Sequence, residues 1–93
     1  MNNNETFKGM TTAGFEWEIP ANRLDNMELV DALADVENGN VFAVSNVVTL
    51  LLGAKQKKRL YDFLRDEDGI VSAQTVSETI AEILQTANET KNY

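Results

Sequence analysis

Two groups of charged side chains near the middle of the chain are the first candidates for chemistry. The basic run at residues 55–59 holds four of the eight basic side chains, and it is a candidate docking surface for an acidic partner or for phosphate groups. The acidic turn at residues 66–69, Asp-Glu-Asp-Gly, has the oxygen-rich composition that binds hard cations. Both groups also fit a plainer role, because charged runs usually form solvated faces and helix connections.

The spacing of the acidic turn does not fit an EF-hand calcium loop. If Gly69 takes the sixth loop position, Leu64 takes the first and Thr75 the last, where carboxylates are required. We therefore interpret the turn as a solvated helix connection and expect no metal site. For the basic run we favour a structural role, in which it balances acidic side chains of a neighbouring helix, namely Asp31, Asp35 and Glu37.

The residue types that most often catalyse reactions near neutral pH are missing. The sequence has no histidine and no cysteine, which removes the commonest proton-transfer side chain, thiol nucleophiles, thiolate metal sites and disulfides. Its serines have no apparent base or orienting group, and its five glycines do not form a phosphate-binding loop. We therefore expect a non-enzymatic protein with no catalytic residue and no cofactor.

Aromatic side chains supply the other candidate surface. Trp17, Phe15, Phe42, Tyr61 and Phe63 could line a groove for a peptide. In a small domain that is short of apolar residues, aromatic side chains more often belong to the core, and we favour that interpretation. The case for a groove is strongest at Trp17, because this residue lies on an edge-like hairpin.

Length and charge limit the classes of partner. A chain of 93 residues corresponds to a single domain with a modest core, since domains typically hold about 100–150 residues. The net charge of −7 repels phosphates, so we expect no nucleic acid partner. The longest apolar stretch is far shorter than the ~20 residues that span a bilayer, and the N-terminal segment lacks the features of a signal peptide. We expect an intracellular protein without a membrane partner.

The elements that position these side chains are predicted from the hydrophobic pattern. Residues 15–19 alternate between apolar and acidic side chains, which is the period of a half-buried strand. They can pair with residues 6–10 in a hairpin that ends at Pro20. A lone hairpin is marginal in water, so its apolar side chains must pack against helices.

The first helix is predicted to begin at Asp25. Asp25 is a good N-cap residue, and Glu28 stands three positions further on, as in a capping box. Gly39 ends the helix, because glycine readily adopts a left-handed conformation. The predicted apolar stripe of this helix consists of Met27, Val30, Leu33 and Ala34, with Leu29 and Val36 beside it.

Residues 41–52 form the ambiguous segment of the chain. Their valines favour a strand, whereas an uninterrupted stretch between Asn40 and Gly53 favours a helix. We interpret the segment as the central buried helix, because it is apolar on nearly all sides. Residues 54–65 form the next predicted helix, with Leu60, Phe63 and Leu64 on one face.

A last helix is predicted after Ser72, which can serve as its cap. Its apolar residues recur at helical spacing, namely Val76, Ile80, Ile83, Leu84 and Ala87. The whole pattern predicts a mainly α fold, a small bundle of about four helices with a short N-terminal β-hairpin or strand. We expect a single domain over residues 1–93, with residues 1–5 and 88–93 as flexible tails.

The order of these features resembles a known protein family. A strand ending in Ile-Pro at residues 19–20 is followed by DALADVENG at residues 31–39, LLLG at residues 50–53 and LYDFLRDEDG at residues 60–69. A final amphipathic helix completes the order. It is similar to that of the small tail assembly chaperones of long-tailed bacteriophages that infect Gram-positive bacteria. The similarity covers residues 15–85, and no functional residue of the family is carried over to this chain.

The resemblance implies a non-enzymatic chaperone that is made in the cytoplasm of the infected host and is absent from the mature virion. Such chaperones coat the long, aggregation-prone tape measure protein while the tail tube assembles around it. The implied partner is therefore the tape measure protein, with the tail tube protein as a second candidate. The resemblance also implies many copies on one partner, or a homo-oligomer, and a longer frameshifted form in many members.

A transient holder of this kind needs exposed apolar surface and enough charge to stay soluble. We hypothesise a groove for a helix of the partner. Weak contacts would still coat a long partner if many copies bind it. The residues assigned to this groove are Trp17, Tyr61 and Phe63, with Lys57, Lys58 and Arg59 on its flanks.

Two other functions compete with this interpretation. An acyl carrier protein is also short, acidic and four-helical, but it needs an Asp-Ser-Leu-like attachment site, and no serine of this chain follows an aspartate. A small acidic protein that binds a regulator, such as an anti-repressor, an antitoxin or a DNA mimic, is compatible with the composition and stays open as the alternative.

Overall fold

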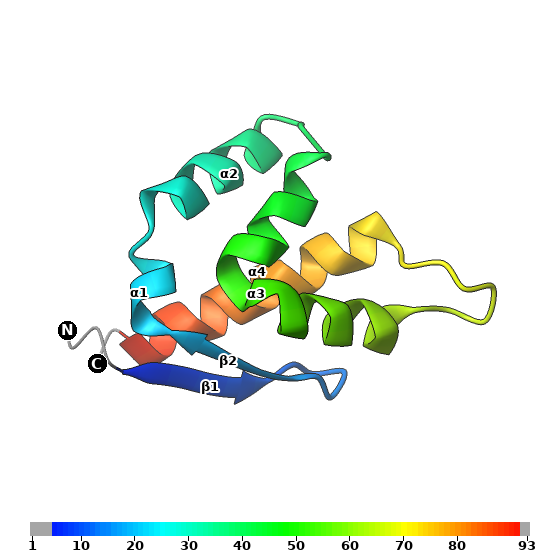
Figure 1. The fold of residues 1–93 in the computed structure, drawn as a ribbon, viewed down its shortest axis with the longest axis horizontal. Coiled ribbons are helices and arrows are strands. Elements are labelled where there is room, and N and C mark those ends of the chain that lie inside the picture. The colour runs from blue at the N-terminus through cyan, green and yellow to red at the C-terminus, as the bar shows by residue number, and fades with distance from the viewer. Residues whose placement is uncertain (1–4, 92–93) are drawn as a thin grey trace.

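The computed structural model describes residues 5–91 and has a two-stranded antiparallel sheet followed by four helices within them (Figure 1). This arrangement confirms the predicted fold class. Most of the two predicted tails, residues 1–4 and 92–93, lies outside the described residues, whereas residues 88–91 continue the last helix. The elements are β1 (Thr6–Met10), β2 (Glu16–Pro20), α1 (Ala21–Leu24), α2 (Met27–Glu37), α3 (Ala43–Leu64) and α4 (Ala73–Lys91).

The hairpin forms as predicted and packs on the helices through one face. Its register pairs Phe7 with Ile19 and Gly9 with Trp17, and the side chains of Phe7, Trp17 and Ile19 are buried. The residues between them are exposed, so the strands show the expected alternation. Thr11 closes the connection, because its Oγ1 accepts a hydrogen bond from the Phe15 N–H at 3.0 Å. The hairpin contacts α4 through β1 and α3 through β2.

The start of α2 differs by one residue from the prediction. Asn26 is the N-cap, and its Oδ1 accepts a hydrogen bond from the Glu28 N–H at 3.0 Å. Asp25 instead ends the short helix α1, which follows directly from Pro20 and was not predicted. Asp and Asn are both favoured N-cap residues, so the residue types alone do not decide between positions 25 and 26. In the structure Asp25 stands at the C-terminal end of α1, and Asn26 caps α2.

The buried face of α2 also differs from the predicted stripe. Leu29 and Ala32 are buried, whereas Met27 is 65% exposed and Val30 is 49% exposed. The prediction that Met27, Val30 and Ala34 lie on the buried face was therefore wrong, since Ala34 is exposed as well. The physical reason is the position of α3, which covers the side of α2 that carries Leu29 and Ala32.

Helix α3 combines two predicted helices into one bent element. Gly53, with φ 82° and ψ 167°, lies outside the helical region, and α3 changes direction there (Figure 1). The ambiguous segment is helical from Ala43 onward, which confirms the helix interpretation. Phe42 lies in the turn before the helix and is 89% exposed. The favoured assignment of Phe42 to the core was therefore wrong.

Helix α4 follows the prediction closely. The Ser72 Oγ accepts a hydrogen bond from the Thr75 N–H at 3.2 Å, which confirms the cap. The predicted apolar residues face the other elements, with Leu84 half-buried and the rest buried. Helix α4 crosses behind the bend of α3 (Figure 1) and contacts both α3 and β1. One continuous core therefore joins the hairpin to α2, α3 and α4.

Candidate functional site

The three aromatic side chains of the predicted groove line three different hollows of the surface. Trp17 is 3% exposed, and its ring lies against Gly9, where an added Cβ would collide with it. Trp17 is thus a core residue, which confirms the favoured interpretation and leaves little of the indole for a partner. Tyr61 is half-buried. Phe63 is 45% exposed, so its favoured assignment to the core was wrong.

Lys57 joins the two halves of α3 across the bend. Its Nζ donates to Ser45 Oγ at 2.8 Å and to Thr49 Oγ1 at 2.9 Å. It also lies 5.7 Å from the centroid of the Tyr61 ring, within the range of a cation–π contact. The polar contacts of Lys57 therefore stabilise the bend at Gly53.

Arg59 and Phe63 cover a buried aromatic ring of the hairpin connection. The Arg59 guanidinium carbon lies 4.8 Å from the centroid of Phe15. The rings of Phe15 and Phe63 lie 5.5 Å apart with an interplanar angle of 56°, a tilted arrangement that aromatic pairs favour. These contacts hold the connection between β1 and β2 against the second half of α3.

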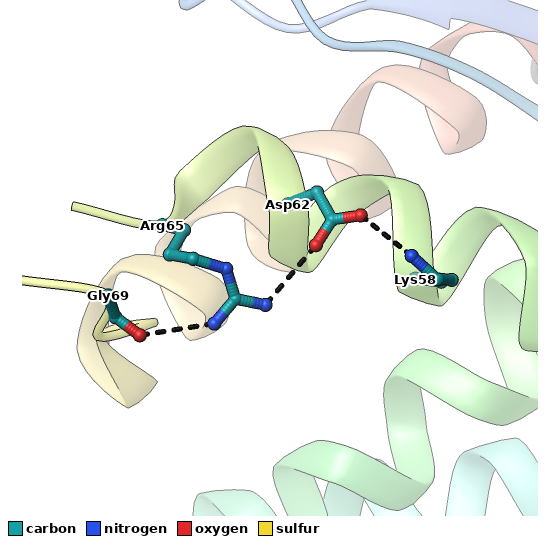
Figure 2. A network of polar contacts seen from close by, with 4 residues as sticks. All are labelled: Lys58, Asp62, Arg65 and Gly69. Atoms are coloured by element: carbon teal, nitrogen blue, oxygen red, sulfur yellow. Dashed lines mark hydrogen bonds and ion pairs between the residues drawn. The ribbon is translucent and has the colours of Figure 1, made fainter. Parts of the chain in front are cut away.

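Lys58 belongs to a chain of polar contacts at the end of α3 (Figure 2). Its Nζ lies 3.0 Å from Asp62 Oδ2, and Arg65 Nη2 lies 3.2 Å from Asp62 Oδ1. Arg65 Nη1 in turn donates to the carbonyl of Gly69 at 3.1 Å. The hydrogen bond from Lys58, followed by that from Arg65, lowers the pKa of Asp62. This network ties the acidic turn to α3.

The predicted balance between the basic run and α2 was wrong. Among the described side chains, the ion pairs are those of Lys58 and Arg65 with Asp62. Spacings of three and four residues bring these groups together on one helix face. The acidic residues of α2 instead face solvent.

The acidic turn uses its first carboxylate internally. Asp66 Oδ1 accepts hydrogen bonds from the backbone N–H groups of Asp68 and Ile70, each at 2.9 Å. Within residues 5–91, no group of three or more acidic side chains is placed to hold a metal ion. The turn is therefore held together by hydrogen bonds between the Asp66 carboxylate and its own backbone.

A mostly apolar hollow lies among α2, α3 and α4 and has a volume of about 300 Å³. Its floor consists of the buried residues Val44 and Val47 of α3. Its walls carry the buried Ile80 and the half-buried Leu33 and Leu84. We call this hollow the α2–α4 groove. Its lining residues are Leu33, Val36, Glu37, Val44, Val47, Ser77, Ile80, Ala81 and Leu84.

The sequence pattern does not single out this groove, because its apolar residues have the spacing of ordinary core residues. The sequence feature that could have pointed to this groove is the absence of basic residues from the two helices that form its walls. Helix α2 carries four acidic residues and no basic one, and residues 73–89 of α4 carry three acidic residues and no basic one. The groove is thus an apolar surface with acidic surroundings.

Comparisons of the chain with protein-family models, with curated proteins and with solved structures found no match. No helix within the described residues is long and apolar enough to cross a membrane.

Proposed function

We propose that this protein is a non-enzymatic tail assembly chaperone that binds the tape measure protein of a bacteriophage and keeps it soluble in the host cytoplasm until the tail tube encloses it. The observation that carries the proposal is the α2–α4 groove. A holder must offer apolar surface to helical segments of its partner, and seven of the nine lining residues are apolar. The order of sequence features supports the identity of the partner.

The size of the groove suits a transient contact. A cavity of about 150 Å³ binds one benzene molecule, so a groove of about 300 Å³ has room for roughly two large apolar side chains. A contact of that size is weak by itself. Many copies bound along one long partner would together keep it soluble.

Co-expression tests this proposal. The chain is produced with the longest coiled-coil protein encoded beside its gene, and the solubility and co-elution of the long protein are measured. We expect the long protein to become soluble and to elute with many copies of this chain. A long protein that stays insoluble and unbound would contradict the proposal and favour a regulator-binding role.

A pair of matched variants tests the groove in the same assay. Ala81 is an exposed residue that lines the groove, and Ala34 is an exposed residue of α2 that does not line it. We expect Ala81→Trp to block the groove and to abolish co-elution. Ala34→Trp should behave as the wild type does.

A further inference from the structure

We infer that the α2–α4 groove binds an amphipathic helix that carries lysine or arginine on both sides of its apolar face and that belongs to a partner protein. The inference rests on the proposed function, because it names the part of the partner that the chaperone holds. It assigns the binding site to α2 and α4, away from the basic and aromatic residues that the sequence analysis favoured.

The shape of the groove fits about two turns of a helix. The α4 wall consists of Ser77, Ile80, Ala81 and Leu84, at positions i, i+3, i+4 and i+7 of one helix face. At a rise of 1.5 Å per residue, this wall is about 11 Å long. The small side chains of Ser77 and Ala81 leave room for the backbone of a partner. A helix with apolar anchors at i, i+3 or i+4, and i+7 matches this length.

The charge around the groove selects a basic partner. Glu37 lines the groove, and the exposed Glu78 follows the lining residue Ser77. The other acidic residues of α2 and α4 do not line the groove, and Glu82 accepts hydrogen bonds from Thr12, but no basic residue between residues 27 and 37 or between 73 and 89 offsets their charge. A groove flanked by one sign of charge attracts the opposite charge and rejects its own.

Within residues 5–91, a second copy of this chain does not offer such a helix. The outward residues Met27, Val30 and Ala34 of α2 have suitable spacing, but α2 carries only acidic charges and would be repelled. The second half of α3 is basic, but Leu60 on its apolar face is fully buried in the chain's own core. The occupant is therefore a helix of another protein.

Binding of two synthetic peptides tests the inference by fluorescence anisotropy with the full chain. Both peptides are longer than the ~15 residues needed for appreciable helicity and share leucines at i, i+3, i+4 and i+7. One has lysine at the flanking positions, and the other has glutamate. We expect the lysine peptide to bind at least tenfold more tightly, with an affinity that falls as salt is added. Equal binding of the two peptides would overturn the inference.

Charge-reversal variants test whether the acidic residues at the groove cause the preference for the lysine peptide. The double variant Glu37→Lys/Glu78→Lys should bind the lysine peptide at least fivefold more weakly and the glutamate peptide more tightly. The control Glu16→Lys/Glu67→Lys changes the net charge equally at exposed positions outside the groove, and it should keep the wild-type preference. An equal loss of preference in both double variants would show that net charge alone is responsible, and it would overturn the assignment to the groove.

Two further outcomes separate this inference from the proposed function. If the peptides bind selectively but the long coiled-coil protein is not held, the chaperone function fails and the groove assignment stands. If wild type and Ala81→Trp hold the long protein equally, the groove assignment fails and the chaperone function stands.

Self-association of the chain is a separate outcome. If the chain self-associates and Ala81→Trp abolishes this, a second copy is the occupant of the groove and the inference is overturned.

Discussion

The side-chain amide of Gln56 closes the outer edge of β2 at Glu18. Gln56 Oε1 accepts a hydrogen bond from the Glu18 N–H at 2.9 Å, and Gln56 Nε2 donates to the Glu18 carbonyl at 2.7 Å. This pair of bonds replaces those that another strand would make. Gln56 Nε2 also donates to the Leu52 carbonyl at 2.8 Å, directly before the bend of α3. One side chain thus links the hairpin to the bend.

Replacing this amide should weaken the fold. Gln56→Met keeps a similar size but removes three hydrogen bonds, each of which contributes about 1 kcal/mol. Water at the edge of the strand can replace part of these bonds in the variant. We therefore expect the free energy of unfolding to fall by about 1–2 kcal/mol in chemical denaturation, which is less than the sum of the three bonds. Gln74→Met is the control, because among the described residues the amide of Gln74 bonds to the exposed Glu78 alone, and its effect should stay within about 0.5 kcal/mol. Equal effects would contradict the linking role of Gln56.

Gly9→Ala tests the close contact between the strands and Trp17. An alanine in a strand is usually more stable than glycine by roughly 0.5–1 kcal/mol. Here the new Cβ would collide with the Trp17 ring, so we expect a loss of about 1–3 kcal/mol, as in other overpacked cores. Trp17 is the only tryptophan, so its fluorescence should shift to the red as water reaches the ring. A stabilised variant with unchanged emission would refute the contact, and Lys8→Ala on the same strand should change neither quantity.

Gly53→Ala tests the bend of α3. The backbone of Gly53 lies in a region that is almost confined to glycine, and other residues there cost about 1–3 kcal/mol. A Cβ would also lie 2.9 Å from Arg23 Nη1. Gly69 has a similar φ of 83° but open space around it, so Gly69→Ala should destabilise the chain less. In thermal denaturation, adding Arg23→Ala to Gly53→Ala should recover little of the loss, because the end of the flexible Arg23 side chain can move away while the backbone strain remains. Full recovery would argue against the backbone strain at Gly53.

The pH dependence of stability should show the contribution of Asp62. The pKa of Asp62 is lowered in the folded chain, chiefly by the hydrogen bond from Lys58. Its ion pairs therefore stabilise the fold fully above the pKa of an unfolded aspartate, about 3.9. This contribution is lost as the pH falls through the lower pKa of the folded state. The unfolding free energies of wild type and Asp62→Asn should thus converge at acid pH. A difference between them that does not change with pH would contradict the ion pairs of Asp62. Asp31→Asn, at an exposed position without an ion pair among the described residues, is the matched control variant.

Local signals were sufficient to predict the order of the hairpin and the longer helices, although they missed the short helix α1 and did not predict that residues 43–64 form one bent helix. The alternation at residues 15–19, the left-handed Gly39 and the cap at Ser72 each act within a few residues of the chain. The buried face of α2 could not be predicted in this way. Helical spacing permits a stripe through Met27 and Val30 as well as one through Leu29 and Ala32, and only the position of α3 decides between them.

The α2–α4 groove could not be predicted for a related reason. Leu33, Val47 and Leu84 come from three separate helices, and each has the spacing of a core residue. Which part of an apolar face stays uncovered depends on how far apart the helices lie, and this distance is a property of the tertiary structure. Lys57 and Arg59 illustrate the converse, because side chains that suggested a docking surface make contacts within the fold.

The most direct test of the account is to locate the bound helix on this protein. The lysine-flanked peptide is added to the full chain, and changes in its two-dimensional amide NMR spectrum are assigned to residues. We expect the largest changes at Val36, Val44, Ser77 and Ala81, which line the α2–α4 groove. Changes concentrated instead at Lys58, Tyr61 and Phe63, with the groove unaffected, would contradict the account and return the binding site to the second half of α3.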